Sequence, residues 1–222
     1  PMFFELLLQL LVGNIDQIMV SHYSQGSVAA IGNGNQIMNI IILVLSSMTV
    51  ATTVLISRYF GAGDPEKAKS VSNASIYSLS FFSIVVTLLI YGFQRPLFQW
   101  LQVPNEILDE TCSYTVIVST CVLIQAIYMV FASILRSHKL MKYVTFVAII
   151  MNTLNILGNA ILINGLFGFP RLGIIGAAIS TNISKFIGLV IIILVFLKKT
   201  NMGLGFLNLK YFSFNMAKKV LL

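Results

Sequence analysis

The sequence contains few charged residues and few of the side chains that build catalytic or metal centres. Of its 222 residues only 9% are charged, and it has two cysteines, two histidines and one tryptophan. A soluble domain carries about 25% charged residues, so this chain lacks the polar surface that a water-facing globule needs. Its composition therefore excludes a soluble enzyme core, a disordered chain and a nucleic-acid-binding domain.

The cysteines and histidines do not form a recognisable site in the sequence. Cys112 and Cys121 lie nine residues apart in one apolar segment, on opposite faces of a helix, and predict neither a disulfide nor a metal site. His22 and His138 are expected at opposite membrane faces. An intramembrane enzyme would need a nucleophile beside a base, or paired ligands, and neither pattern is visible. We therefore expect no enzymatic activity and no bound cofactor.

Long apolar runs dominate the chain. Hydrophobic residues make up 57% of it, and its mean hydropathy is +0.91. The runs do not alternate between apolar and polar residues as a membrane barrel requires, so helices are expected. The sequence predicts an all-α, polytopic membrane protein with a bundle of six transmembrane helices, at about 1–21, 28–57, 71–93, 107–135, 143–164 and 172–197.

Lysine and arginine are distributed unequally between the two sides of the predicted bundle. One side carries only Arg95 and Arg171. Because basic residues accumulate in cytoplasmic loops, we expect the other side to be cytoplasmic, with both ends of the chain there and the protein in the plasma (inner) membrane. The net charge of +7 then reflects topology and requires no nucleic-acid partner. The basic side carries Arg58, Lys67, Lys69, Arg136, Lys139, Lys142, Lys198, Lys199, Lys210, Lys218 and Lys219.

The chain divides into a membrane domain and a short tail. Residues 1–199 are expected to form one transmembrane lobe, and residues 200–222 a linker towards a second lobe that this sequence does not contain. Within that linker, residues 204–222 have the pattern of an amphipathic segment on the inner membrane surface. The chain starts at Pro1, inside an apolar run, and we expect it to lack its natural N-terminus.

Three ionisable residues fall inside the predicted spans: Glu5, Asp16 and Lys185. A charge at membrane depth costs at least about 2.5–3.5 kcal/mol, so such residues usually face a protein interior or a water-filled cavity. Spacings of four and seven place Glu5, Gln9 and Asp16 on one stripe of the first helix. Lys185 could pair with a carboxylate or a substrate anion, or extend towards the membrane surface.

Depth counting brings four polar residues to a similar level of the membrane. At about 1.5 Å per residue, Asp16 and Asn159 lie about 9 Å below the outer ends of their helices, and Asn155 and Thr181 about 15 and 14 Å. Oxygen-rich groups of this kind suit a small cation such as Na⁺, and an intramembrane aspartate can instead carry a proton. Asparagines also join membrane helices by hydrogen bonds, so both interpretations stay open.

Several segments resemble the multidrug and toxic compound extrusion (MATE) transporters. The similar stretches are Pro1–Glu5 with Asn14–Val20 and Ala29–Gly32, Arg58–Asp64, Leu135–Ser137, Leu154–Asn159 and Gly173–Thr181, in the order of the family. The resemblance implies the N-terminal six-helix lobe of a twelve-helix antiporter, with a cation (H⁺ or Na⁺) site at Asp16, Asn155, Asn159 and Thr181.

The same resemblance implies a transport function. We expect efflux of a small cationic, amphipathic compound by alternating access, coupled to H⁺ or Na⁺, with the lipid bilayer and the absent C-terminal lobe as partners. Residues expected at the substrate cavity are Gln9, Glu5, Asn35, Gln36 and Lys185. Some relatives carry aspartate where Asn159 stands here, which leaves the choice of ion open. Two alternatives are a lipid-linked oligosaccharide flippase of the same superfamily and a membrane protein without transport activity.

Overall fold

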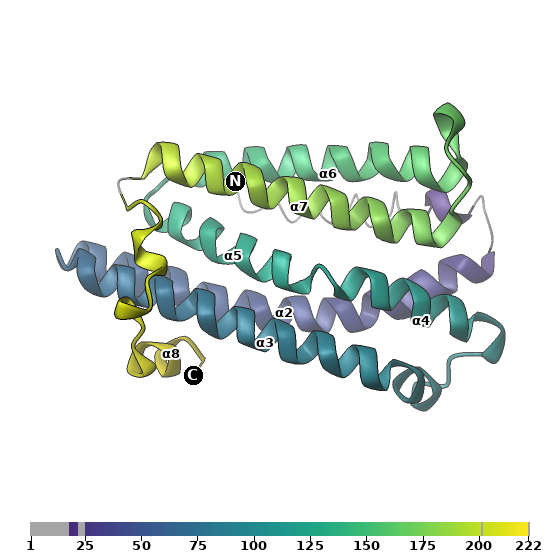
Figure 1. The fold of residues 1–222 in the computed structure, drawn as a ribbon, viewed down its shortest axis with the longest axis horizontal. Helices are drawn as coiled ribbons and strands as arrows, with labels where there is room; N and C mark the ends of the chain where they lie inside the picture. Colours follow the sequence, from purple (N-terminus) through teal and green to yellow (C-terminus); the bar gives the residue numbers. More distant parts are fainter. Residues whose placement is uncertain (1–17, 22–24, 201, 222) are drawn as a thin grey trace.

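The computed structural model describes residues 18–21, 25–200 and 202–221, and in this part of the chain it contains helices and no strand. Figure 1 shows the long helices lying side by side along one axis, with α6 and α7 forming one pair. The helices are α2 (Gln25–Gly61), α3 (Pro65–Trp100), α4 (Asn105–Ser119), α5 (Val122–Ser137), α6 (Met141–Asn164), α7 (Gly173–Lys199) and α8 (Phe214–Leu221), with 3₁₀ turns η1 (Leu166–Gly168), η2 (Leu204–Leu207) and η3 (Leu209–Tyr211).

The length and apolarity of the helices make this a multi-pass membrane protein. Helices α2, α3, α6 and α7 are each long and apolar enough to cross a bilayer, and α4 with α5 forms a fifth, bent crossing. Most of the first expected span, 1–21, lies outside the described residues, although 18–21 are helical. Helix α3 has 36 residues and is about 54 Å long, so it extends well beyond a hydrocarbon core of about 30 Å.

The sequence prediction of one continuous helix at 107–135 is wrong in one respect. The structure interrupts it at Thr120 and Cys121, and α4 and α5 meet at an angle of 41°. The prediction missed the interruption because this stretch contains neither proline nor glycine. Polar side chains of α3 and α7 bind carbonyl groups at the interruption.

The turn between α2 and α3 follows the local signals of the sequence. Asp64 caps α3 by accepting a hydrogen bond from the Lys67 backbone N–H at 3.1 Å, and Pro65 occupies the first helical position. The Lys67 ammonium lies 2.6 Å from the Asp64 carboxylate. This contact holds the pKa of Asp64 below its usual value. Asp64 and Pro65 thus start α3 in the way that these residue types commonly start helices.

The segment after α7 folds back onto the protein. Phe206 of η2 is fully enclosed and packs edge-on against Phe131 and Phe196, with ring centroids 6.3 and 5.7 Å away. Ala217 and Val220 of α8 are also buried, whereas Phe212 and Phe214 are exposed. Only part of the apolar surface expected in 204–222 is therefore available to lipid.

The Phe206→Ala substitution should release this segment from the bundle. Truncating a fully buried phenylalanine costs about 3–5 kcal/mol through lost burial and the cavity left behind. We expect a decrease of that size in the free energy of unfolding in detergent micelles, together with faster protease cleavage of 202–221. The control, Leu204→Ala, changes a residue of the same turn that is 41% exposed, and an equal effect of both substitutions would contradict the packing described.

Candidate functional site

Helices α6 and α7 approach each other closely because small residues line their contact. A Cβ atom on Gly158 of α6 would collide with the Ser180 side chain of α7. A Cβ atom on Gly176 of α7 would lie 2.7 Å from the backbone oxygen of Leu162 on α6. Only glycine permits such close backbone approach, as is common between membrane helices. The polar side chains beside these glycines are therefore brought within hydrogen-bonding distance.

A polar cluster occupies this contact. The Asn155 side-chain amide donates to Thr181 Oγ1 at 3.1 Å, and the Ser180 hydroxyl donates to the Asn155 backbone oxygen at 2.9 Å. The Thr181 hydroxyl donates to the backbone oxygen of Ala177 at 2.9 Å. Asn159, one turn further along α6, is fully buried. The structure thus brings Asn155 and Thr181 together, as the depth estimate led us to expect.

Other residues of the predicted sites have different surroundings. Asp16, Gln9 and Glu5 lie outside the described residues. The Tyr114 hydroxyl donates to Asn35 Oδ1 at 2.9 Å, so Asn35 links α2 to α4, while Gln36 is exposed. Both the hydrogen bond of Asn35 and that of Asn155 are compatible with a purely structural role.

Lys185 lies on α7, one turn beyond Thr181, and is partly buried. It interacts electrostatically with Cys121, at the interruption between α4 and α5. Lys185 therefore faces the inside of the bundle at the level of the broken crossing. Among the described residues no group of three His, Cys, Asp or Glu side chains could hold a metal ion.

The interruption of the α4–α5 crossing is a polar feature that sequence reasoning missed. The Asn182 side-chain amide of α7 donates to the Ile117 backbone oxygen at 2.7 Å and to Thr120 Oγ1 at 3.0 Å. The Thr87 hydroxyl of α3 donates to the Ser119 backbone oxygen at 3.1 Å. Side chains from two neighbouring helices thus bind the carbonyl groups that the bend exposes. In the sequence Asn182 attracts attention only as part of a glycosylation sequon, which cannot function inside a membrane span.

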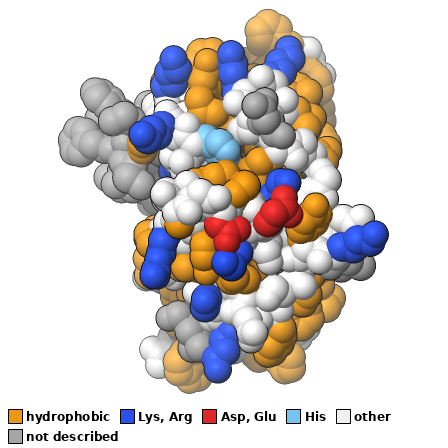
Figure 2. Space-filling view, turned by 90° about the vertical axis from the view of Figure 1, so that its left-hand side faces the viewer, with side chains coloured by type: hydrophobic (Ala, Val, Ile, Leu, Met, Phe, Trp, Pro, Cys, Tyr) orange, Lys and Arg blue, Asp and Glu red, His pale blue; other side chains and the backbone are white. Residues whose placement is uncertain are grey.

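One end of the bundle is strongly basic. The turns that follow α2, α5 and α7 meet there, and Figure 2 shows lysine and arginine side chains gathered on this end, with few acidic ones between them. Arg95 lies at the opposite end, 3.2 Å from Asp109. The basic residues that the sequence assigns to one side of the membrane therefore lie on one face of the structure.

Comparison with protein families gives a match to the MatE family over residues 1–161. Among curated proteins, the chain is 37% identical over 205 residues to the uncharacterized transporter YisQ of Bacillus subtilis, a match that covers 92% of this chain and 45% of that protein. It is 29% identical over 204 residues to the probable multidrug resistance protein NorM of Thermotoga maritima, covering 90% and 43%. The chain spans about half the length of these relatives.

Solved structures share the fold. A crystal structure of MATE in the bent conformation superposes with a TM-score of 0.86 at 25% identity, covering all of this chain and 49% of that one. A transporter of the MOP superfamily from Pyrococcus furiosus, described as having a binding pocket of reverse polarity, superposes with a TM-score of 0.85 at 24% identity, covering 100% and 48%. In both cases the matched region is about half of the larger protein.

The Gly176→Ala substitution should force α6 and α7 apart. The added methyl group meets a backbone oxygen, which cannot rotate away, so we expect the free energy of unfolding in detergent to fall by about 1–3 kcal/mol. Gly92→Ala in α3 is the matched control, because a Cβ atom there meets nothing within 4 Å. That variant should be neutral or slightly more stable, given alanine's higher helix propensity. Equal destabilisation by both would contradict the close contact.

The Asn182→Ala substitution should destabilise the broken crossing. It removes the interhelical donor of the Ile117 carbonyl, which then accepts only from the Thr120 hydroxyl of its own segment at 2.7 Å. We expect the free energy of unfolding to fall by about 1 kcal/mol, the net contribution of one hydrogen bond. Hydrogen exchange of the α4–α5 backbone amides should accelerate. In the control, Asn164→Ala, the lost amide is exposed and bonds only to its own helix, and it should leave exchange in α4–α5 unchanged.

Proposed function

We propose that this chain, which belongs to the MatE family, forms one lobe of a secondary active transporter that exports cationic, amphipathic compounds in exchange for H⁺ or Na⁺. Its relative in Thermotoga maritima is named a probable multidrug resistance protein. The chain corresponds to about half of that protein, so the proposal assigns the second half of the transport path to another lobe. MATE transporters are not enzymes, and the function proposed is transport without covalent chemistry.

The observation that carries the proposal is the contact between Asn155 and Thr181, with Asn159 buried one turn away. An amide oxygen and a hydroxyl oxygen are ligands that hard cations accept. The cluster lies between two helices inside a membrane-spanning bundle, where polar groups are expensive and usually functional. Asp16 would supply the negative charge, because the sequence places it at a similar depth on the first helix.

Ion binding would drive transport by favouring one arrangement of the lobes. A ligand shifts a conformational equilibrium only by its difference in affinity for the two states. Binding of H⁺ or Na⁺ from the outside at Asp16, Asn155, Asn159 and Thr181 would therefore favour the state that releases substrate outwards. We place the protein in the inner membrane with the basic end of the bundle facing the cytoplasm. This orientation follows because lysine and arginine accumulate on the cytoplasmic side of membrane proteins.

The Asp16→Asn and Asn155→Ala substitutions should each impair ion-coupled efflux in the full-length transporter. Asp16→Asn removes the only acidic group proposed for the site, so efflux of a fluorescent cationic dye should lose its dependence on the ion gradient. Asn155→Ala removes one neutral ligand, and the ion concentration needed for half-maximal efflux should rise on the order of tenfold. The measurement is dye efflux from cells, with the proton and sodium gradients collapsed separately.

The matched control is Asn164→Ala, which changes the same residue type at an exposed position at the end of α6. Wild-type coupling in Asp16→Asn would refute the proposed ion site. A well-expressed wild-type protein that exports no cationic dye would instead favour a lipid-linked oligosaccharide flippase, for which Lys185 would be the candidate contact with an anionic headgroup.

A further inference from the structure

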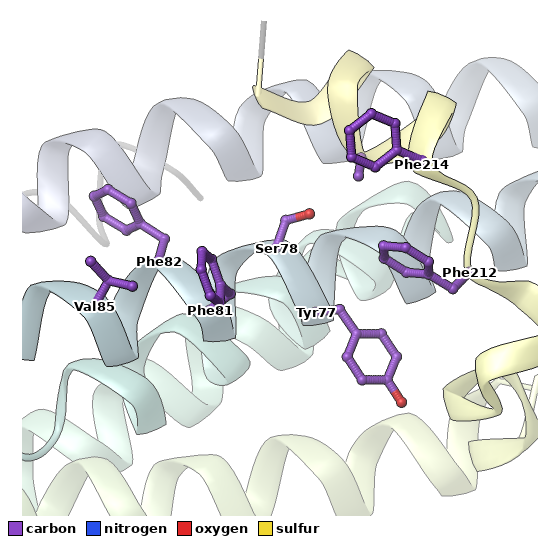
Figure 3. A pocket seen from close by; sticks show the side chains of 8 residues that line it. Tyr77, Ser78, Phe81, Phe82, Val85, Phe212 and Phe214 are labelled. Carbon is purple, nitrogen blue, oxygen red and sulfur yellow. The ribbon is translucent and has the colours of Figure 1, made fainter.

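A pocket of about 640 Å³ lies between α3 and the segment that follows α7. Figure 3 shows its walls: Tyr77, Phe81, Phe82 and Val85 come from α3, and Phe212 and Phe214 from the returning segment. The pocket is on the outside of the bundle and does not include Asn155, Thr181 or Lys185. It is therefore separate from the proposed ion site.

The returning segment is held firmly enough to form a lasting wall. The Asn73 amide donates to the Phe206 backbone oxygen at 2.7 Å, and the Tyr77 hydroxyl donates to that of Leu207 at 3.0 Å. The Tyr77 ring also packs edge-on against Phe212, with centroids 5.8 Å apart. Since α3 fixes the segment at several points, the pocket is a built part of the fold.

The surfaces that border the pocket are apolar and open to the surroundings. Phe81 is 70% exposed and Phe214 is 77% exposed. The Tyr77 hydroxyl is already bonded to backbone, so the walls present mainly carbon atoms to an occupant. An apolar surface of this kind on a membrane protein favours a hydrocarbon chain, because about 0.8 kcal/mol is gained for each CH₂ group buried.

The position of the pocket along α3 places it at one edge of the hydrocarbon core. Arg95 pairs with Asp109 at the far end of α3, and at about 1.5 Å per residue Val85 lies about 15 Å and Tyr77 about 27 Å from it along the helix. A hydrocarbon core of about 30 Å therefore ends near Tyr77, at the edge of the pocket. An occupant would extend from the acyl region into the headgroup region of the leaflet nearest the basic end.

Positive charge lies beside the pocket at the headgroup level. Lys210 precedes Phe212, while Lys218 and Lys219 follow the pocket-lining residue Ala217, and all three lysines are exposed. Residues 201–222 contain no aspartate or glutamate. An apolar pocket with basic side chains at its membrane-surface end is complementary to a molecule with an acyl chain and an anionic headgroup.

We propose that this pocket binds an anionic phospholipid, with one acyl chain between Phe81, Val85 and Phe212 and the phosphate beside Lys218 and Lys219. The lipid would join the returning segment to α3 on the membrane side. The site depends only on the described fold and the membrane setting, so it can fail or succeed independently of the proposed ion coupling.

Quenching of a tryptophan in the pocket by brominated lipids tests this binding. The reporter Phe212→Trp is introduced together with Trp100→Phe, which removes the natural tryptophan. A second reporter, Leu88→Trp, serves as the control. Leu88 lies on the same face of α3 outside the pocket, and its side chain is 65% exposed. The protein is reconstituted in vesicles of phosphatidylcholine and phosphatidylglycerol, with either lipid brominated. The preference is the relative affinity for phosphatidylglycerol over phosphatidylcholine that the quenching reports. We expect it to be at least about fivefold larger at position 212 than at position 88, because one nearby lysine contributes about 1 kcal/mol to the binding of an anionic lipid.

The double substitution Lys218→Gln with Lys219→Gln should reduce the preference at position 212 to the level at position 88. Lys198→Gln with Lys199→Gln removes the same charge at the end of α7 and should leave it unchanged. Equal preference at both reporters, or a preference that survives the loss of Lys218 and Lys219, would overturn the proposal. So would the absence of quenching by either lipid at position 212, because another part of the protein would then fill the pocket.

Discussion

The structure depends on the requirement that polar groups inside a membrane find partners within the protein. Hydrocarbon offers no hydrogen bonds, so each exposed carbonyl group must be bound by a neighbouring helix. The interrupted crossing of α4 and α5 meets this requirement through Asn182 and Thr87, which bind the carbonyl oxygens of Ile117 and Ser119. The bend can therefore persist, and α3 and α7 are both joined by hydrogen bonds to the end of α4.

The same requirement gives the contact between α6 and α7 its character. Gly158 and Gly176 allow the two backbones to approach, and Asn155, Ser180 and Thr181 then satisfy one another. A cluster of this kind holds two helices in a fixed register while leaving oxygen atoms at membrane depth. Structural support and ion binding are compatible in one set of side chains, because a cation would use the oxygen atoms that the helix contact already brings together.

The segment after α7 extends this organisation to the membrane surface. It uses side chains of α3 as partners for its own backbone, with Asn73 and Tyr77 binding the carbonyl oxygens of Phe206 and Leu207. Phe206 enters the aromatic core, while Phe212 and Phe214 stay outside. The result is an apolar pocket next to lysines at the basic end of the bundle, where membrane lipid and protein meet.

Composition and hydropathy alone determined that the chain is a helical membrane protein, because 9% charged residues cannot cover a soluble globule. Local signals determined the cap at Asp64, and helical depth placed Asn155 and Thr181 at one level, because both depend on spacing along a single chain. Only the tertiary structure decided that α4 and α5 are separate helices, that Asn182 and Thr87 bind carbonyl groups at their junction, and that the returning segment forms one wall of a pocket on α3. Those features depend on which helices lie side by side, and neighbouring helices in a bundle share no local sequence signal.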